Sequence, residues 1–173
     1  MHLKKGYVQV YTGDGKGKTT AAIGLAIRAL GAGLKVYICQ FLKKGIYSES
    51  KALKKFNNIK INCFGRGCLI KGKPKDIDKK LASKGLKTVK NIISRNIYDI
   101  VILDEINIAL KLKLIPIKDV MDILINKPKN TEIILTGRYA PKEIKDLAHL
   151  VTEMKDVRHY YGKNVKCRKG IEY

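Results

Sequence analysis

A glycine-rich stretch near the start of the chain carries the residues best suited to binding phosphate. It reads Thr12-Gly13-Asp14-Gly15-Lys16-Gly17-Lys18-Thr19-Thr20. Glycine has no Cβ, so such a segment can adopt positive φ angles and turn its backbone N–H groups toward an anion. A helix that follows adds unpaired N–H groups and its dipole to that attraction. Lys18 can then reach the outer phosphates, and the hydroxyl of Thr19 can bind Mg²⁺.

The stretch departs from the usual phosphate-loop pattern at one position. The pattern G-x-x-x-x-G-K-[ST] requires a glycine five residues before Gly17, where this chain has Thr12. An apolar run precedes the stretch and an alanine-rich run follows it, as the flanking strand and helix require. A plain turn between strand and helix would not explain Lys18 followed by Thr19. We therefore expect a variant phosphate loop.

Two acidic residues and an arginine follow further apolar runs. Asp104 and Glu105 follow the run at 100–103, and Arg138 closely follows the run at 132–136. A carboxylate can hold Mg²⁺ directly or through water, and an arginine offers a fork of donors to phosphate oxygens. The alternatives are acidic residues that complement a helix dipole and an arginine in a surface salt bridge.

The secondary structure that must position these residues alternates between strands and helices. Strands are expected at 7–12, 35–41, 59–63, 100–103, 132–136 and 149–153, and helices at 18–30, 48–56, 75–95, 106–112, 117–126 and 141–147. The alternation predicts an α/β fold with a mostly parallel sheet and helices on both faces. Ligands of such sheets bind at the carboxyl ends of the strands, so the three motifs converge on one edge. That edge should bind a Mg-nucleoside triphosphate, although the motifs do not identify the bond that breaks.

Two other segments are candidates for ligand contacts. The helix at 18–30 is apolar on nearly all sides, which predicts that it is well buried. Arg28 is a single charge inside it, and its side chain can extend into solvent or reach toward a phosphate or a subunit interface. The glycine-rich segment 64–74 is a candidate ligand-binding loop.

Composition limits the class of protein. A chain of 173 residues fits one domain, so we expect residues 1–173 to form a single domain. No apolar run approaches the roughly 18–20 residues of a membrane helix, and the first residues lack a signal-peptide core, which predicts a cytoplasmic protein. The four cysteines form no C-x-x-C pair. The net charge of +21 suits nucleic acid or an anionic small ligand, but the lysines are spread along the chain, so we do not expect a nucleic-acid partner.

Six segments together resemble the ATP:corrinoid adenosyltransferases of the cobalamin-biosynthesis type. They are TGDGKGKTTAA at 12–22, QF at 40–41, LDEIN at 103–107, LTGR at 135–138, LVTEM at 150–154 and RKGIEY at 168–173. Their order and spacing carry the resemblance over about residues 7–173. The resemblance implies a RecA-like P-loop fold, a homodimer, and ATP with Mg²⁺ or Mn²⁺. It also implies transfer of the 5′-deoxyadenosyl group of ATP to Co(I) of a reduced corrinoid, which a flavoprotein supplies with electrons.

The resemblance assigns roles to particular residues. ATP lies in residues 12–20 with reversed polarity, so that C5′ of the ribose faces the corrinoid and the loop holds the triphosphate leaving group. Lys18, Arg138 and Glu105 are the expected catalytic residues. Thr19 with Asp104 or Glu105 is expected to hold the metal ion.

Four further residues are expected to contact the nucleotide or the corrinoid: Arg28 and His159, which match family positions, and Cys68 and Ile70, which lie in the glycine-rich segment 64–74. Where the family often has Asn in the loop this chain has Asp14, whose charge would repel triphosphate unless it points away or meets metal. Where the family has aromatic residues after Gly67, this chain has Cys68-Leu69-Ile70. The thiol of Cys68 could touch cobalt or simply pack in the loop, and His159 could be a surface histidine.

Two alternative functions stay open at this point. A different RecA-like P-loop ATPase or kinase would transfer the γ-phosphate, with Glu105 positioning the nucleophile. A nucleic-acid-binding module would use the positive charge and would bind DNA with a steep dependence on salt.

Overall fold

A computed structural model describes residues 2–45, 47–67, 70, 72–163 and 165–172 of the chain. Within these residues, parallel strands form one six-stranded sheet in the order β3-β2-β4-β5-β1-β6. The strands are β1 (Val8–Thr12), β2 (Val36–Phe41), β3 (Ile59–Phe64), β4 (Ile100–Asp104), β5 (Glu132–Thr136) and β6 (Leu150–Glu153).

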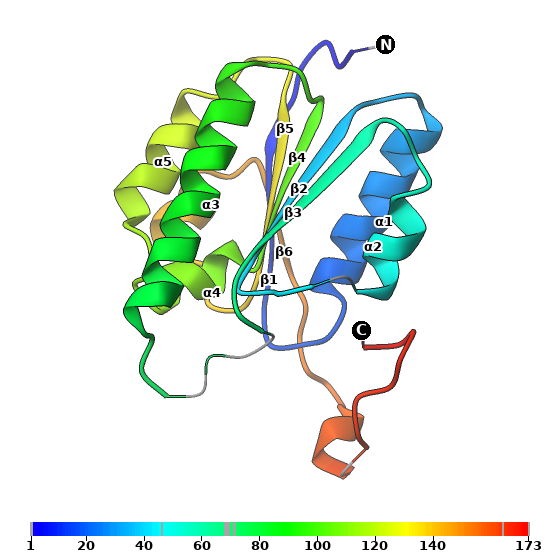
Figure 1. The fold of residues 1–173 in the computed structure, drawn as a ribbon, viewed down its shortest axis with the longest axis vertical. Helices are drawn as coiled ribbons and strands as arrows, with labels where there is room; N and C mark the ends of the chain where they lie inside the picture. The colour runs from blue at the N-terminus through cyan, green and yellow to red at the C-terminus, as the bar shows by residue number, and fades with distance from the viewer. Residues whose placement is uncertain (1, 46, 68–69, 71, 164, 173) are drawn as a thin grey trace.

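Helices cover both faces of the sheet, as the alternating pattern predicted (Figure 1). The helices α1 (Lys18–Gly31) and α2 (Ser48–Leu53) lie on one face. The helices α3 (Asp76–Ser94), α4 (Ile106–Lys111), α5 (Ile117–Ile125) and α6 (Lys142–Leu147) lie on the other. The predicted α/β class with a parallel sheet is confirmed.

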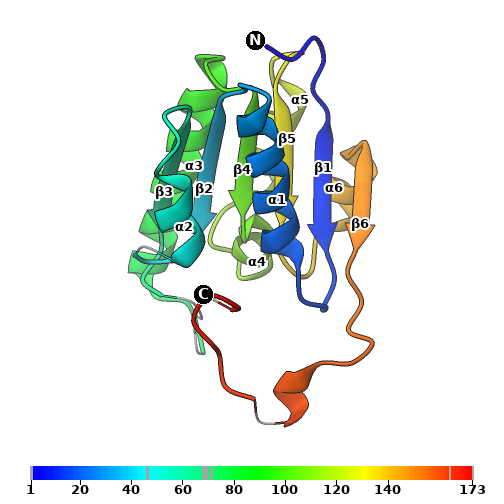
Figure 2. The same ribbon diagram turned by 90° about the vertical axis from the view of Figure 1, so that its right-hand side faces the viewer.

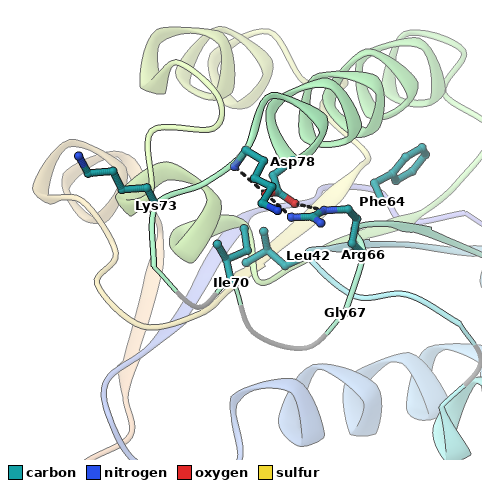
Figure 3. A pocket seen from close by; sticks show the side chains of 9 residues that line it. Leu42, Phe64, Arg66, Gly67, Ile70, Lys73 and Asp78 are labelled. Carbon is teal, nitrogen blue, oxygen red and sulfur yellow. Dashed lines mark hydrogen bonds and ion pairs between the residues drawn. The ribbon is translucent and has the colours of Figure 1, made fainter.

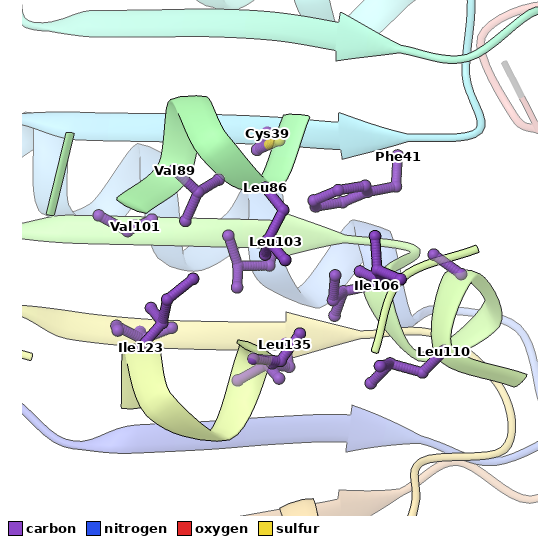
Figure 4. Close-up of a cluster of buried hydrophobic side chains, with 14 of the residues drawn as sticks. Cys39, Phe41, Leu86, Val89, Val101, Leu103, Ile106, Leu110, Ile123 and Leu135 are labelled. Atoms are coloured by element: carbon purple, nitrogen blue, oxygen red, sulfur yellow. The ribbon is translucent and has the colours of Figure 1, made fainter. Parts of the chain in front are cut away.

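The core consists of two apolar layers, one on each face of the sheet. Alternate residues of a strand point to opposite faces, so neighbouring residues of β4 and β5 enter different layers. Leu103 and Leu135 belong to the layer that includes Leu86 of α3 (Figure 4). Ile102 and Ile134 belong to the layer beneath α1. Both layers fix the ends of β4 and β5, where the polar residues of interest begin.

Helix α1 buries one face only, which corrects the prediction that it is well buried. Ala22, Ala26 and Ala29 face the sheet and are almost fully buried. Small side chains at this spacing let the helix lie close to the strands. Ile27 is 51% exposed and Arg28 is also exposed, because they lie on the opposite side of the helix.

Several boundaries differ from those predicted. The strand β4 includes Asp104, so this carboxylate belongs to the last residue of a buried strand. The helix expected at 48–56 ends at Leu53. A short 3₁₀ helix (Tyr160–Lys163), which was not predicted, lies in the C-terminal segment. Among the described residues, no helix is both long enough and apolar enough to cross a membrane.

Candidate functional site

The glycine-rich loop joins β1 to α1 at the carboxyl edge of the sheet, and close packing requires its glycines. Gly13 has a φ of 95°, and a Cβ placed on it would lie 2.3 Å from the carbonyl oxygen of Met154. A Cβ on Gly15 would lie 2.6 Å from the carbonyl oxygen of Lys155. The N–H of Gly15 donates to the Met154 carbonyl oxygen at 2.7 Å. The segment after β6 therefore braces the loop from outside, a role that local sequence pattern did not indicate.

Thr12, which replaces the usual first glycine, has a structural function. Its side chain is buried, and its Oγ1 accepts a hydrogen bond from the N–H of Ala140 at 3.2 Å. The carbonyl oxygen of Thr12 also accepts from the N–H of Met154 at 2.9 Å. Thr12 thus ties the start of the loop to the segments that follow β5 and β6.

Lys18 and Thr19 begin α1 and point back to the carboxyl edge. The ammonium of Lys18 donates to the carbonyl oxygen of Gly15 at 2.6 Å, so the side chain folds over the loop. Burial, and then the nearby guanidinium of Arg138, lowers the pKa of Lys18. The hydroxyl of Thr19 donates to Oδ1 of Asp104 at 2.8 Å. Because β5 alone separates β1 from β4 in the sheet, the loop and Asp104 meet as predicted.

Asp104 accepts hydrogen bonds from four side chains and is 1% exposed. Its Oδ1 also accepts from the hydroxyl of Thr136 at 2.7 Å. Its Oδ2 accepts from the ammonium of Lys43 at 2.8 Å and from Nε2 of Gln40 at 3.2 Å. Burial favours the protonated acid, but the charge of Lys43 and the hydroxyl donors outweigh burial and hold the pKa of Asp104 below its usual range. The carboxylate is therefore ionised at neutral pH.

Glu105 lies beside this cluster and has a different environment. Its backbone is left-handed, with a φ of 61°, and its N–H donates to Oγ1 of Thr136 at 3.0 Å. Burial, and then the charge of Asp104, raises the pKa of Glu105. A Cβ on Gly137 would lie 3.2 Å from Oε2 of Glu105, so the glycine leaves room for this carboxyl group. Asp104, rather than Glu105, contacts Thr19.

Asp14 and Arg138 pair with each other at the exposed rim of the loop. Nη2 of Arg138 donates to the backbone carbonyl oxygen of Asp14 at 3.1 Å, and Nε lies 3.9 Å from Oδ1 of Asp14. The Asp14 side chain is 65% exposed. Its carboxylate therefore faces solvent and a guanidinium, which answers the concern that it would repel a triphosphate from within the loop.

The C-terminal segment (residues 155–163 and 165–172) returns to the same edge of the sheet (Figure 2). The ammonium of Lys16 donates to Oε1 of Glu172 at 2.7 Å and to the hydroxyl of Tyr160 at 2.6 Å. The N–H of Arg168 donates to Oε2 of Glu172 at 2.7 Å. His159 packs on Tyr160, with ring centroids 4.9 Å apart, so it belongs to this segment.

Two other predicted residues lie away from the loop interior. Thr20 is in the first turn of α1 and is exposed. Arg28 is exposed in the last turn of α1. Since a helix rises about 1.5 Å per residue, Arg28 lies roughly 15 Å along the axis from Lys18. Within this chain, α1 does not bring Arg28 to the phosphate loop.

A cavity of about 190 Å³ opens at the start of the second glycine-rich segment (Figure 3). Its apolar lining includes Leu42, Phe64 and Ile70. On its polar side, Nε and Nη2 of Arg66 each donate to the carboxylate of Asp78 at 2.8 Å. The predicted contact Cys68 lies outside the described residues.

The fold and the loop together define a class of protein. A parallel α/β sheet with Lys18, Thr19 and Asp104 at its carboxyl edge is that of a RecA-like P-loop nucleotide-binding protein. A KaiC-like protein of Pyrococcus horikoshii OT3 has the same fold, with a TM-score of 0.55 and 14% identity. The similarity covers 90% of this chain and 75% of that chain.

Sequence comparison then identifies the family. Residues 4–173 match the family described as ATP:corrinoid adenosyltransferase BtuR/CobO/CobP, and the chain belongs to that family. Corrinoid adenosyltransferases of Escherichia coli K12 and of Sinorhizobium sp. are 31% and 33% identical to this chain; each alignment covers 98% of the chain and 87% or 81% of the relative. An uncharacterized protein of Nostoc sp. is 32% identical over 96% of this chain, which spans 48% of that protein's length.

Sequence reasoning missed several parts of this site. Lys43 was not among the predicted site residues, and neither Thr136 nor Met154 was given a function. Lys43 does follow the end of a predicted strand, the signal that drew attention to Asp104. That signal would have placed Lys43 beside Asp104 only if the order of the strands were known, because β2 and β4 are neighbours in the sheet and not in the chain.

Proposed function

We propose that this chain transfers the 5′-deoxyadenosyl group of ATP to Co(I) of a reduced corrinoid and releases triphosphate. The product is adenosylcobalamin or adenosylcobinamide. The observation that carries the proposal is the meeting of the phosphate loop, the Asp104 cluster and an apolar cavity at one edge of the sheet, in a chain of this family. Family membership favours this reaction over γ-phosphate transfer by another RecA-like ATPase or kinase.

The residues of the loop would bind the leaving group. Co(I) is a strong nucleophile, so attack at C5′ needs no general base. The cobalt–carbon bond forms as the bond between C5′ and the triphosphate oxygen breaks, and the electron pair leaves with the triphosphate. The backbone N–H groups of residues 13–20 and the ammonium of Lys18 would stabilise the negative charge on the leaving group. Arg138, at the rim, would add a second cationic contact, and Glu105 would lie beside the reacting phosphates.

The oxygen atoms of Thr19 and Asp104 fit a hard divalent cation. Mg²⁺ takes one or two protein oxygens together with phosphate oxygens and water, and Mn²⁺ accepts the same ligands. The hydroxyl oxygen of Thr19, in the first turn of α1, and Oδ1 of Asp104 are already 2.8 Å apart in a hydrogen bond. The metal would neutralise charge on the triphosphate. Glu105 is the second candidate carboxylate, because its side chain lies next to this pair.

The corrinoid would lie against the cavity beside β2 and β3. Leu42, Phe64 and Ile70 offer it an apolar surface, at the same edge of the sheet as the phosphate loop. We infer that Cys68 belongs to the same contact region, since it lies between Gly67 and Ile70 in the chain. We propose that Arg28 acts from a subunit interface and that His159 acts from the C-terminal segment.

The proposed partners and assembly of the chain rest on the family resemblance and on its exposed apolar residues. We infer that residues 1–173 act as a single cytoplasmic domain, that a flavoprotein supplies the electron to the corrinoid, and that nucleic acid is not a partner. A homodimer is supported by the exposed apolar residues Leu150 (45%) and Val151 (43%) on β6, which is an edge strand. Exposed edges of this kind are usually covered in folded proteins.

The test is product analysis with ATP, a divalent cation and chemically reduced cobalamin. We expect triphosphate together with the absorbance change that accompanies formation of the cobalt–carbon bond. Lys18→Ala should reduce the rate by about 100-fold or more, because it removes a cation from the leaving group. Lys44→Ala, at an exposed lysine outside the loop, is the matched control. Release of ADP and phosphate without corrinoid product would overturn the proposal.

A further inference from the structure

Asp104 already has a full set of partners before any metal ion is considered. An ionised carboxylate has about four acceptor positions. In Asp104, the hydroxyls of Thr19 and Thr136 occupy Oδ1, and the side chains of Lys43 and Gln40 occupy Oδ2. Among the described residues, Lys43 is the one cation within salt-bridge distance of this carboxylate. Lys43 therefore supplies the positive charge that a buried carboxylate requires.

The backbone is shaped to deliver Lys43 to this position. Leu42 precedes it with a φ of 66°, a left-handed conformation that is unusual for leucine. The N–H of Leu42 donates to the carbonyl oxygen of Phe64 at 3.1 Å, and its carbonyl oxygen accepts from the N–H of Gly67 at 3.3 Å. This turn at the end of β2 directs the Lys43 side chain inward, where it is 15% exposed. The next residue, Lys44, remains exposed.

We propose that Lys43 is an internal counter-ion that keeps Asp104 from binding a divalent cation until a nucleotide is present. The proposal rests on the proposed function for the presence of a metal ion at Thr19 and Asp104. A divalent cation at this point would lie close to the ammonium of Lys43, and two cations beside one buried carboxylate repel each other. The triphosphate of ATP changes this balance, because its oxygens supply the missing negative charge.

The triphosphate also offers Lys43 another partner. The ammonium can move from Oδ2 of Asp104 to a phosphate oxygen while metal and nucleotide bind together. Lys43 then contributes a cation to the leaving group, in addition to Lys18. Binding of metal and nucleotide is coupled in this arrangement, and the reaction site stays free of metal when ATP is absent.

The experiment measures the binding of Mn²⁺ to the protein in the absence of ATP and corrinoid. The electron paramagnetic resonance signal of free Mn²⁺ reports how much of the ion remains unbound. We compare the wild-type protein with Lys43→Gln, which keeps a hydrogen-bond donor but removes the charge, and with Lys43→Arg, which keeps the charge. Lys44→Gln is the matched control for loss of one positive charge from the same loop.

The proposal expects Lys43→Gln to bind Mn²⁺ on the order of tenfold more tightly than the wild type, because one neighbouring cation has been removed. Lys43→Arg and Lys44→Gln should bind as weakly as the wild type. Equal dissociation constants for Lys43→Gln and Lys44→Gln would overturn the proposal, and so would tight Mn²⁺ binding by the wild type without nucleotide.

Thermal unfolding provides a second measurement, which keeps the proposal testable if Lys43→Gln folds less stably than the wild type. Without metal, this variant should melt at a lower temperature than Lys44→Gln, since Asp104 has lost its counter-ion, and Mn²⁺ alone should restore much of the loss. A loss that Mn²⁺ does not restore would contradict the proposal. The adenosyl-transfer assay of the wild type is separate, so a failure of the proposed function is recognised independently of the Mn²⁺ result.

Discussion

Individual residues at the carboxyl edge depend on partners that lie far away in the chain. Asp104 receives donors from α1, from β5 and from the end of β2, so three separate segments of the chain must be in place to complete its hydrogen bonds. Asp78 has a similar role at the cavity, where it holds Arg66 and accepts from the N–H of Lys75 at 2.9 Å. Both carboxylates are buried, and their partners offset the desolvation that burial causes.

The Arg66–Asp78 pair leads to a prediction about pH. The guanidinium of Arg66 holds the pKa of Asp78 below its usual value, although burial opposes this effect. A carboxyl group whose pKa is lower in the folded state stabilises the fold above its unfolded pKa, about 3.9, and loses that contribution as the pH falls through the folded value. Asp78→Asn should therefore reduce the free energy of unfolding at pH 7, and its difference from the wild type should shrink below about pH 4.

Chemical denaturation followed by circular dichroism at a series of pH values provides the measurement. The control is Asp76→Asn, an exposed residue in the first turn of the same helix. A difference between Asp78→Asn and the wild type that stays constant from pH 7 to about pH 2 would show that ionisation of Asp78 does not stabilise the fold.

At the scale of elements, the phosphate loop is held between α1 and the segment that follows β6. Gly13 and Gly15 allow the backbone of this segment to approach within van der Waals distance. Lys16 extends from the loop to Glu172 and Tyr160 of the C-terminal segment. The loop is therefore shaped by tertiary packing as well as by its own sequence.

This packing predicts that alanine substitutions at two glycines with positive φ will destabilise the fold to different extents. Gly33→Ala places a methyl group in open space, so it should cost only the strain of a left-handed alanine, about 1 kcal/mol. Gly13→Ala adds a clash with the backbone of Met154 and should cost about 2–4 kcal/mol, because the loop must move away from β6.

Denaturation gives the two stability changes, and calorimetry with inorganic triphosphate gives the effect on binding. We expect Gly13→Ala to weaken triphosphate binding and Gly33→Ala to leave it unchanged. Equal stability and equal binding in the two variants would show that the contact with Met154 is unimportant.

At the scale of the whole molecule, the positive net charge affects how a triphosphate approaches the loop. The net charge is +21, yet three cations around the loop are paired with carboxylates of the protein: Lys16 with Glu172, Arg138 with Asp14, and Lys43 with Asp104. An incoming triphosphate must compete with these carboxylates, while the overall positive field favours its approach.

The apolar edge of the sheet leads to a prediction about assembly. If β6 contributes to the proposed homodimer, Val151→Lys should shift the protein toward monomer, because it places a charge in an apolar contact. Ile125→Lys, at the 63% exposed end of α5, is the control and should leave the dimer intact. Sedimentation velocity at matched concentrations distinguishes the two outcomes. A dimer that persists in Val151→Lys would exclude this edge as the interface.

The sequence by itself determined the features that depend on neighbouring residues. The strand, glycine loop and helix around Lys18 were predictable because their pattern is contiguous, and the alternation of strands and helices predicted a parallel sheet. The convergence of the loop with Asp104 and with the segment that ends in Arg138 followed from the rule that ligands bind at the carboxyl ends of parallel strands. Six short segments in a characteristic order were sufficient to indicate the family, and the comparisons confirm it.

Only the tertiary structure decided which polar groups meet. Thr12 bonds Ala140, Lys43 reaches Asp104, and Lys16 reaches Glu172, across separations of 128, 61 and 156 residues. Local periodicity contains no information on such pairs, because they depend on the order of strands in the sheet and on the path of the C-terminal segment. The physical reason is that polar and charged groups bond with whichever partners the folded chain brings near them, and that buried ones lose free energy without such partners.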